Sequence, residues 1–136
     1  MTAPTSHYFT TASISAEAAQ TLLMAAIKAA AALGVEISAA VVDNGGILKA
    51  FIRNDAAPFL TVDAAINKAW TSASFGYPTH VWNSFMNDPQ LAPISHVPKV
   101  LAVGGGFPLM FDGKIIGGLG ISGGPTPRIR KSPNWH

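Results

Sequence analysis

The segment that most constrains the fold is a glycine-dense stretch, residues 103–124, in which an Asp-Gly pair separates two apolar runs. Asp112-Gly113 between such runs is a strong signal for a hairpin with a tight two-residue turn. Glycines weaken the interior of a strand, so their number here requires a physical reason. The close approach of a ligand or of a second backbone is such a reason. The segment therefore predicts a small antiparallel sheet with something packed against it.

The preceding residues predict two helices separated by a second hairpin. Ser15 is placed to cap a helix that ends at Gly34, a residue that readily takes the left-handed conformation. Residues 36–53 read as two strands joined by an Asp-Asn-Gly-Gly turn. Thr61 is the expected cap of a second helix, which Gly76 ends.

The order of these elements predicts the fold class. Thr79 is the expected cap of a short third helix, and residues 99–103 are expected to open the last strands. No strand–helix–strand alternation indicates a parallel sheet, so we predict one α+β domain with about five antiparallel strands and helices packed on one face. The domain is expected over residues 13–124, with a flexible arm at 1–12 and a proline-rich tail at 125–136.

Composition indicates a protein that associates with itself. Hydrophobic residues make up 49% of the 136 residues and charged residues only 12%, against about 25% charged in an average soluble domain. A short chain buries a small share of its surface, so we expect part of the apolar surface to lie in a homo-oligomer interface or a ligand pocket. There are no cysteines, which excludes disulfides and thiolate metal sites.

Membranes and nucleic acids are not expected partners. The weakly polar run from Ala18 to Val35 is rich in alanine and contains Gln20 and Lys28, which favours a core helix over a membrane span. Basic residues gather only at the end of the chain, too few for a nucleic-acid-binding face. The first residues lack the pattern of a secretory signal, so we predict a cytoplasmic protein.

Several segments together resemble a known family. They are residues 40–46 (Ala-Val-Val-Asp-Asn-Gly-Gly), 53–57 (Arg-Asn-Asp-Ala-Ala), Asp63 with 67–69 (Asn-Lys-Ala), 75–79 (Phe-Gly-Tyr-Pro-Thr), 104–109 (Gly-Gly-Gly-Phe-Pro-Leu) and 112–124 (Asp-Gly-Lys-Ile-Ile-Gly-Gly-Leu-Gly-Ile-Ser-Gly-Gly). In this order and spacing they resemble the GlcG/HbpS heme-binding-like family, which includes the C-terminal domain of PduO-type proteins.

The resemblance implies a profilin-like architecture with a five-stranded antiparallel sheet, and oligomers built from dimers, often octamers. Family members include heme-binding and redox-sensing proteins, and others that are encoded beside catabolic enzymes. After residue 124 the family usually continues into a final helix, whereas residues 125–136 contain three prolines, which forbid a helix. We expect this tail to cover a pocket or to reach a neighbouring subunit.

Two of the four histidines are candidate functional residues. His96 lies in an irregular proline-rich loop, where binding sites often occur, and His80 begins a short helix. Either imidazole is a candidate axial ligand of heme iron or a general acid or base. No histidine pair has the spacing of a zinc motif, so the sequence favours an ordinary loop or surface position for each histidine, and no other metal site is predicted.

Heme would need an apolar wall and cations for its propionates. Tyr77, Trp82 and Phe85 are candidates for the wall, although aromatic residues of this kind often simply pack a core. Arg53 and Lys68 are candidate cations.

The glycine run offers main-chain contacts. Gly105, Gly106 and the adjacent Phe107 are expected to present backbone close to a ligand. No Lys-Ser/Thr and capped helix follow the run, so it is not a nucleotide-binding loop.

The sequence leaves three functional hypotheses: a binding protein, an enzyme, and an accessory protein with no chemistry of its own. The first is binding of a small ligand, heme being the implied cofactor. The alternative is a cofactor-independent lyase, isomerase or hydratase acting on an oxygenated small molecule, in which His96 or His80 works with Lys68, Asp63 or Arg53. Asp63 would equally suit a helix N-terminus. The third is an accessory protein whose pocket is filled by its own side chains.

Overall fold

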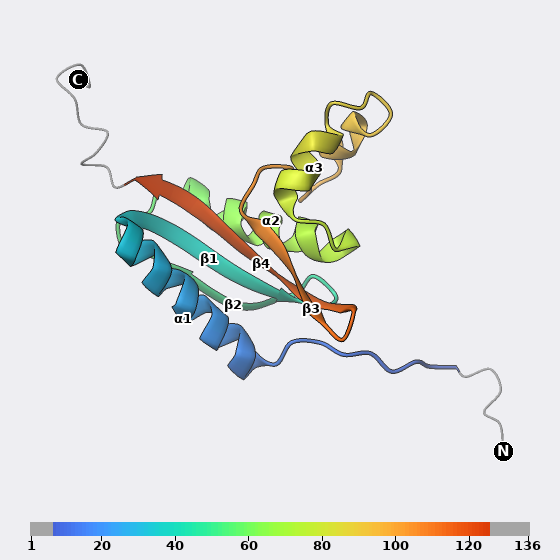
Figure 1. The fold of residues 1–136 in the computed structure, drawn as a ribbon, viewed down its shortest axis with the longest axis horizontal. Helices are drawn as coiled ribbons and strands as arrows, with labels where there is room; N and C mark the ends of the chain where they lie inside the picture. Colours follow the sequence, from blue (N-terminus) through green and yellow to red (C-terminus); the bar gives the residue numbers. More distant parts are fainter. Residues whose placement is uncertain (1–6, 126–136) are drawn as a thin grey trace.

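Four antiparallel strands form a single sheet in the order β2-β1-β4-β3 (Figure 1). The strands are β1 (Val35–Asp43), β2 (Leu48–Arg53), β3 (Gly106–Phe111) and β4 (Lys114–Pro125). The structure is a computed structural model that describes residues 7–125. The predicted proline-rich tail therefore lies outside the described residues, apart from its first position.

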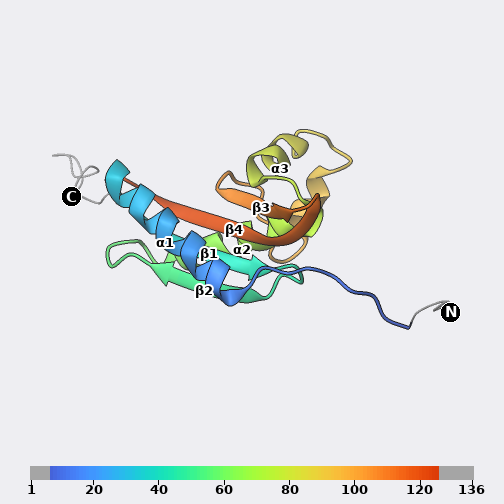
Figure 2. The same ribbon diagram turned by 60° about the horizontal axis from the view of Figure 1, so that its bottom comes forward.

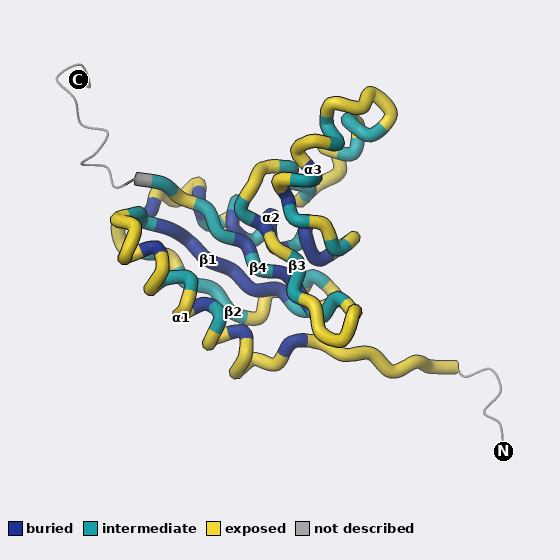
Figure 3. Tube along the Cα trace, viewed as in Figure 1, coloured by how far each residue is buried: buried dark blue, intermediate teal, exposed yellow. Residues whose placement is uncertain are grey.

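The two long helices lie on opposite faces of the sheet, α1 (Ala16–Leu33) on one and α2 (Leu60–Phe75) on the other (Figures 1 and 2). Successive side chains of a strand point to opposite faces. Val41 of β1 accordingly belongs to the core cluster under α1, whereas Val42 packs with alanines of α2. The α+β class is confirmed, but the helices cover both faces instead of the one expected. Residues 37–42 of β1 are buried without interruption (Figure 3), because a strand covered on both faces needs no alternation of polar and apolar side chains.

The glycine-rich hairpin is confirmed as β3 and β4. Asp112 and Gly113 both have positive φ, 53° and 76°, as a tight hairpin turn of the primed type requires. The strand glycines admit the backbone of α2: a Cβ on Gly120 would collide with the carbonyl oxygen of Ala65 and lie 2.7 Å from the amide nitrogen of Ala69. The close partner of the hairpin is therefore a helix backbone of the same chain.

Residues 99–103 do not form the expected strand, and the sheet has four strands instead of about five. Lys99 has a φ of 75°, outside the extended region. The Thr71 hydroxyl donates to the Lys99 carbonyl oxygen (3.1 Å) and accepts from the Leu101 amide (2.9 Å). A side chain of α2 thus satisfies main-chain groups that a neighbouring strand would otherwise satisfy.

The predicted helix ends are largely confirmed. Ser15 Oγ accepts the Ala18 amide at 3.1 Å, and Gly34 and Gly76 end α1 and α2 with φ of 71° and 78°. Thr61 is not the cap of α2, because the helix already begins at Leu60 and Thr61 lies inside it. Its buried hydroxyl instead donates to the Pro58 carbonyl oxygen at 2.6 Å.

Two short helices complete the fold. α3 (Thr79–Phe85) follows α2 as expected, and the 3₁₀ helix η1 (Ala92–His96) lies in a lobe that projects from the sheet beyond α3 (Figure 1). By length and composition alone α1 could cross a membrane, which is weak support for a span because the core helix of a soluble protein passes the same test. One face of α1 packs on the sheet through Ala19, Leu23 and Ala30.

Candidate functional site

Lys68 is a buried cation in the middle of α2. Its side chain is 7% exposed, and its Nζ donates to the Ile121 carbonyl oxygen of β4 at 3.2 Å. Within residues 7–125 no carboxylate forms an ion pair with it. Burial disfavours the charged form and lowers the pKa of the Lys68 amine below its ordinary value of 10.5. The Lys68 amine is therefore closer to its neutral, proton-accepting form than a surface lysine.

A glycine turn, residues 104–106, lies directly against this amine. The Gly106 amide donates to Thr79 Oγ1 (2.7 Å), and the Gly105 carbonyl oxygen accepts the Ile121 amide (2.8 Å). Gly105 has a φ of 123°, and a Cβ there would lie 3.0 Å from Lys68 Nζ and collide with the Ile121 carbonyl oxygen. Only glycine permits the main chain to approach the amine this closely.

His80 lies next to Gly104, the first residue of the same turn. A Cβ on Gly104 would lie 3.5 Å from the Cβ of His80, whose side chain is exposed. Among the described residues, the amides of Gly104 and Gly105 donate to no protein acceptor. We call Lys68, the glycine turn, Thr79 and His80 the Lys68 site. It offers a cation, two free main-chain donors and an imidazole, which together suit a small anionic or oxygenated ligand.

The predicted aromatic wall is a packed cluster beside this site. The ring centroids of Tyr77 and Trp82 each lie 5.5 Å from that of Phe85, with the rings nearly perpendicular. Such edge-to-face pairs are typical of core packing. The Trp82 side chain is 5% exposed, and its buried Nε1 has no hydrogen-bond partner among the described residues. Tyr77 is 46% exposed and could still offer a ring to a ligand.

The other predicted site residues lie elsewhere. His96 is exposed in η1, and Asp63 is exposed in the first turn of α2. Arg53 donates to the Ala57 carbonyl oxygen at 2.7 Å and closes the loop between β2 and α2. Phe107 pairs with Leu119 across the hairpin, and Leu119 packs on the α1 side of the sheet, so Phe107 faces away from Lys68.

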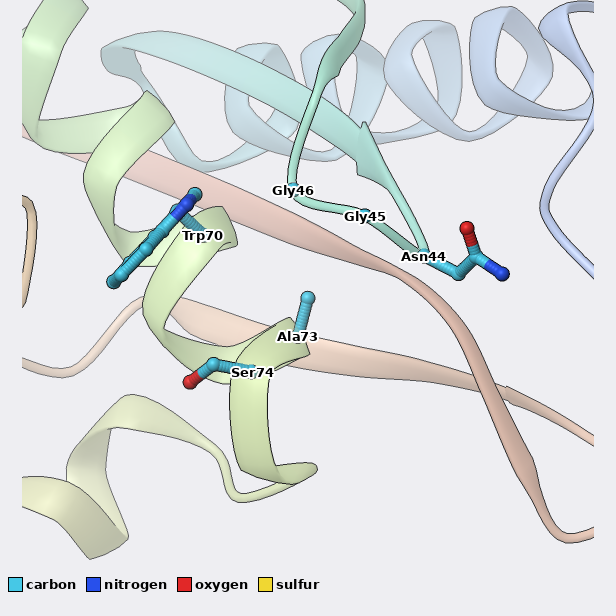
Figure 4. Close-up of a pocket in the computed structure, with 6 residues that line it drawn as sticks. All are labelled: Asn44, Gly45, Gly46, Trp70, Ala73 and Ser74. Carbon is cyan, nitrogen blue, oxygen red and sulfur yellow. The ribbon is translucent and has the colours of Figure 1, made fainter.

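A separate shallow pocket of about 180 Å³ lies between the β1–β2 turn and α2 (Figure 4). It is lined by Asn44, Gly45, Gly46, Trp70, Ala73 and Ser74. No charged side chain lines it, and the Asn44 amide group is already bonded to the Thr11 hydroxyl and the Ala12 carbonyl oxygen of the N-terminal segment. This pocket contains none of the predicted site residues.

The sequence did not identify the part played by Thr79. It was expected to cap a helix, whereas its fully buried hydroxyl holds the glycine turn through Gly106. A threonine after Tyr-Pro is compatible with both roles, so no local signal distinguishes them. Residues 7–125 contain no cluster of three His, Cys, Asp or Glu side chains that could hold a metal ion.

The chain is similar to several known proteins. A family described as "Haem degrading protein HbpS-like" matches residues 14–128. An uncharacterized 15.0 kDa protein of the dhaT–dhaS intergenic region in Citrobacter freundii is 30% identical over 122 residues, 88% of this chain and 86% of that protein.

Two solved structures share the fold. A doubly substituted variant of HbpS from Streptomyces reticuli superposes with a TM-score of 0.84 at 29% identity, covering 95% of this chain and 87% of the other. A complex of PduOC with heme gives a TM-score of 0.77 at 33% identity, covering 84% and 85%.

Proposed function

The chain belongs to the HbpS-like family, and we propose that it binds a small anionic or oxygenated ligand at the Lys68 site, with heme as the first candidate. The observation that carries this proposal is the buried Lys68 amine, which lies against the glycine turn with no carboxylate partner within residues 7–125. A buried cation of this kind is costly unless something compensates it. An anionic group on a ligand supplies that compensation.

The residues of the site fit heme in kind. The exposed His80 imidazole would be a suitable ligand for the heme iron, while Lys68 and the free amides of Gly104 and Gly105 would suit a propionate. The indole Nε1 of Trp82, two residues after His80, is a further donor; it is buried beside Tyr77 and has no hydrogen-bond partner among the described residues. When bound, heme would supply an iron centre for redox chemistry or gas binding. The PduOC structure, which contains heme, supports this choice.

Hemin titration tests the proposal directly. We expect a saturable Soret shift that His80→Ala abolishes and that His96→Ala leaves unchanged, because His80, and not His96, borders the glycine turn. Lys68→Met is expected to weaken binding, whereas Lys28→Met, on the exposed part of α1, is the matched control. A shift that survives both His80→Ala and Lys68→Met would place the heme elsewhere.

A second candidate function is a cofactor-independent lyase, isomerase or hydratase. The lowered pKa of the Lys68 amine favours it, because an amine that is more often neutral can accept a proton from a substrate carbon. Exchange of the methyl protons of pyruvate in D₂O, followed by NMR, measures this activity. Exchange catalysed by the wild-type protein and lost in Lys68→Met, but not in Lys28→Met, would support it, and exchange at the rate of buffer alone would exclude it for pyruvate.

We further propose that the protein is a homo-oligomer built from dimers. Large apolar side chains are exposed on the single chain, among them Leu33 (78%), Phe59 (89%), Leu60 (78%) and Phe111 (66%). Burial of part of this apolar surface against a second copy of the chain would stabilise such an assembly. Light scattering at micromolar concentration tests this, and a monomeric mass would refute it. The cytoplasmic location stays a prediction.

A further inference from the structure

We infer that Lys68 forms a Schiff base with small 2-oxo acids, its ε-amine attacking the ketone carbon while the glycine turn holds the carboxylate. This inference rests on the ligand site proposed above and names a substrate class for it. Three features of the structure carry it: the burial of the amine, the main-chain donors beside it, and the histidine next to Gly104.

The first feature is the isolation of the amine. Lys68 Nζ has one described acceptor, the Ile121 carbonyl oxygen at 3.2 Å, and no carboxylate partner within residues 7–125. Lys68 as a residue is only 7% exposed, so water compensates little of its charge. Such an environment favours the neutral amine, which carries the lone pair that a carbonyl carbon accepts.

The second feature is the pair of free donors. The amides of Gly104 and Gly105 donate to no acceptor among the described residues, and Gly105 lies against Lys68 Nζ. Consecutive main-chain amides in a glycine turn bind carboxylates well. A carboxylate held there would place an adjacent ketone carbon within reach of the amine.

The third feature is His80, whose Cβ would lie 3.5 Å from a Cβ placed on Gly104. Attack by the amine forms the C–N bond and a carbinolamine, and the proton lost from nitrogen and the proton gained by the leaving hydroxyl both need a carrier. The exposed imidazole of His80 can donate and accept these protons. Loss of one water molecule then gives the iminium, and no oxidant or reductant takes part.

Borohydride trapping with pyruvate tests the inference on the intact protein. We expect one reduced adduct, seen by intact-mass spectrometry and mapped to Lys68 by peptide analysis. Lys68→Arg keeps a positive charge but has no nucleophilic amine, so the adduct should be lost; Lys28→Arg should retain it. The wild-type mapping decides the matter even if Lys68→Arg fails to fold.

The outcomes separate the covalent step from the binding site. Saturable pyruvate binding with no trapped adduct would overturn the Schiff base and leave the proposed ligand site standing. Adducts spread evenly over the exposed lysines would overturn it as well. Absence of binding by both pyruvate and hemin would refute the ligand site itself.

Discussion

Substitution of Gly105 by alanine tests how tightly the glycine turn is held against Lys68. An alanine at this position must adopt a φ of 123°, which L-residues rarely tolerate, and its Cβ would collide with the Ile121 carbonyl oxygen and lie 3.0 Å from Lys68 Nζ. The turn can relieve the collision only by moving away from β4. That movement breaks the 2.8 Å hydrogen bond from the Ile121 amide to the Gly105 carbonyl oxygen.

Two terms set the expected loss of stability. An unfavourable φ costs about 1–3 kcal/mol, and loss of the hydrogen bond costs about 0.5–1.5 kcal/mol. Together they predict that Gly105→Ala lowers the free energy of unfolding by about 1.5–4.5 kcal/mol. A domain with about 5–15 kcal/mol of stability would in most cases remain folded.

Gly104→Ala is the matched control for this change. A Cβ there would lie 3.5 Å from the Cβ of His80, an ordinary contact, and Gly104 has no positive φ. We expect its free energy of unfolding to stay within about 0.5 kcal/mol of wild type.

Urea unfolding followed by circular dichroism measures both variants. With a slope of about 2 kcal/mol per molar, the urea midpoint of Gly105→Ala should fall by about 0.8–2.2 M, and that of Gly104→Ala should hardly move. Equal midpoints for the two variants would refute the close contact between the turn, Ile121 and Lys68.

Three further results are expected. Gly120→Ala should destabilise the protein by about 3 kcal/mol or more, because α2 must move away from β4 to clear the Ala65 carbonyl oxygen; a urea midpoint equal to wild type would contradict this. Thr79→Val should cost about 1–3 kcal/mol by leaving the buried Gly106 amide unpaired, and hydrogen exchange of that amide should accelerate. The folded state lowers the pKa of Lys68, so at pH values between that lowered pKa and 10.5 unfolding takes up a proton. The free energy of unfolding of the wild type relative to Lys68→Met should therefore rise with pH over this window. A stability difference between the two proteins that is constant with pH would contradict this.

Local features of the sequence determined the elements that depend on a few neighbouring residues. Asp112-Gly113 specified the hairpin turn because both positions need positive φ. Ser15 and Gly34 specified the ends of α1 through contacts within one helical turn. Thr61 shows the limit of such rules, since a tertiary contact with Ser38 of β1, 2.8 Å between the hydroxyl oxygens, engages the side chain that would have capped α2.

The same distinction holds for the candidate site. Lys68, His80, Gly105 and Gly106 were selected from the sequence as separate candidates, and the structure places them around one turn. Their assembly depends on Thr79, whose hydroxyl reaches a residue 27 positions away. No local pattern encodes a contact at that separation.

The sequence by itself determined that this chain has two long helices, two hairpins and an α+β domain, because helix ends and turns depend on local backbone preferences. Tertiary structure alone decided which face each helix covers and that residues 99–103 form a loop held by Thr71. It also decided that Lys68 is buried against Ile121, 53 residues away. These outcomes depend on close packing between distant segments, where glycines on β4 let the backbone of α2 settle on the sheet.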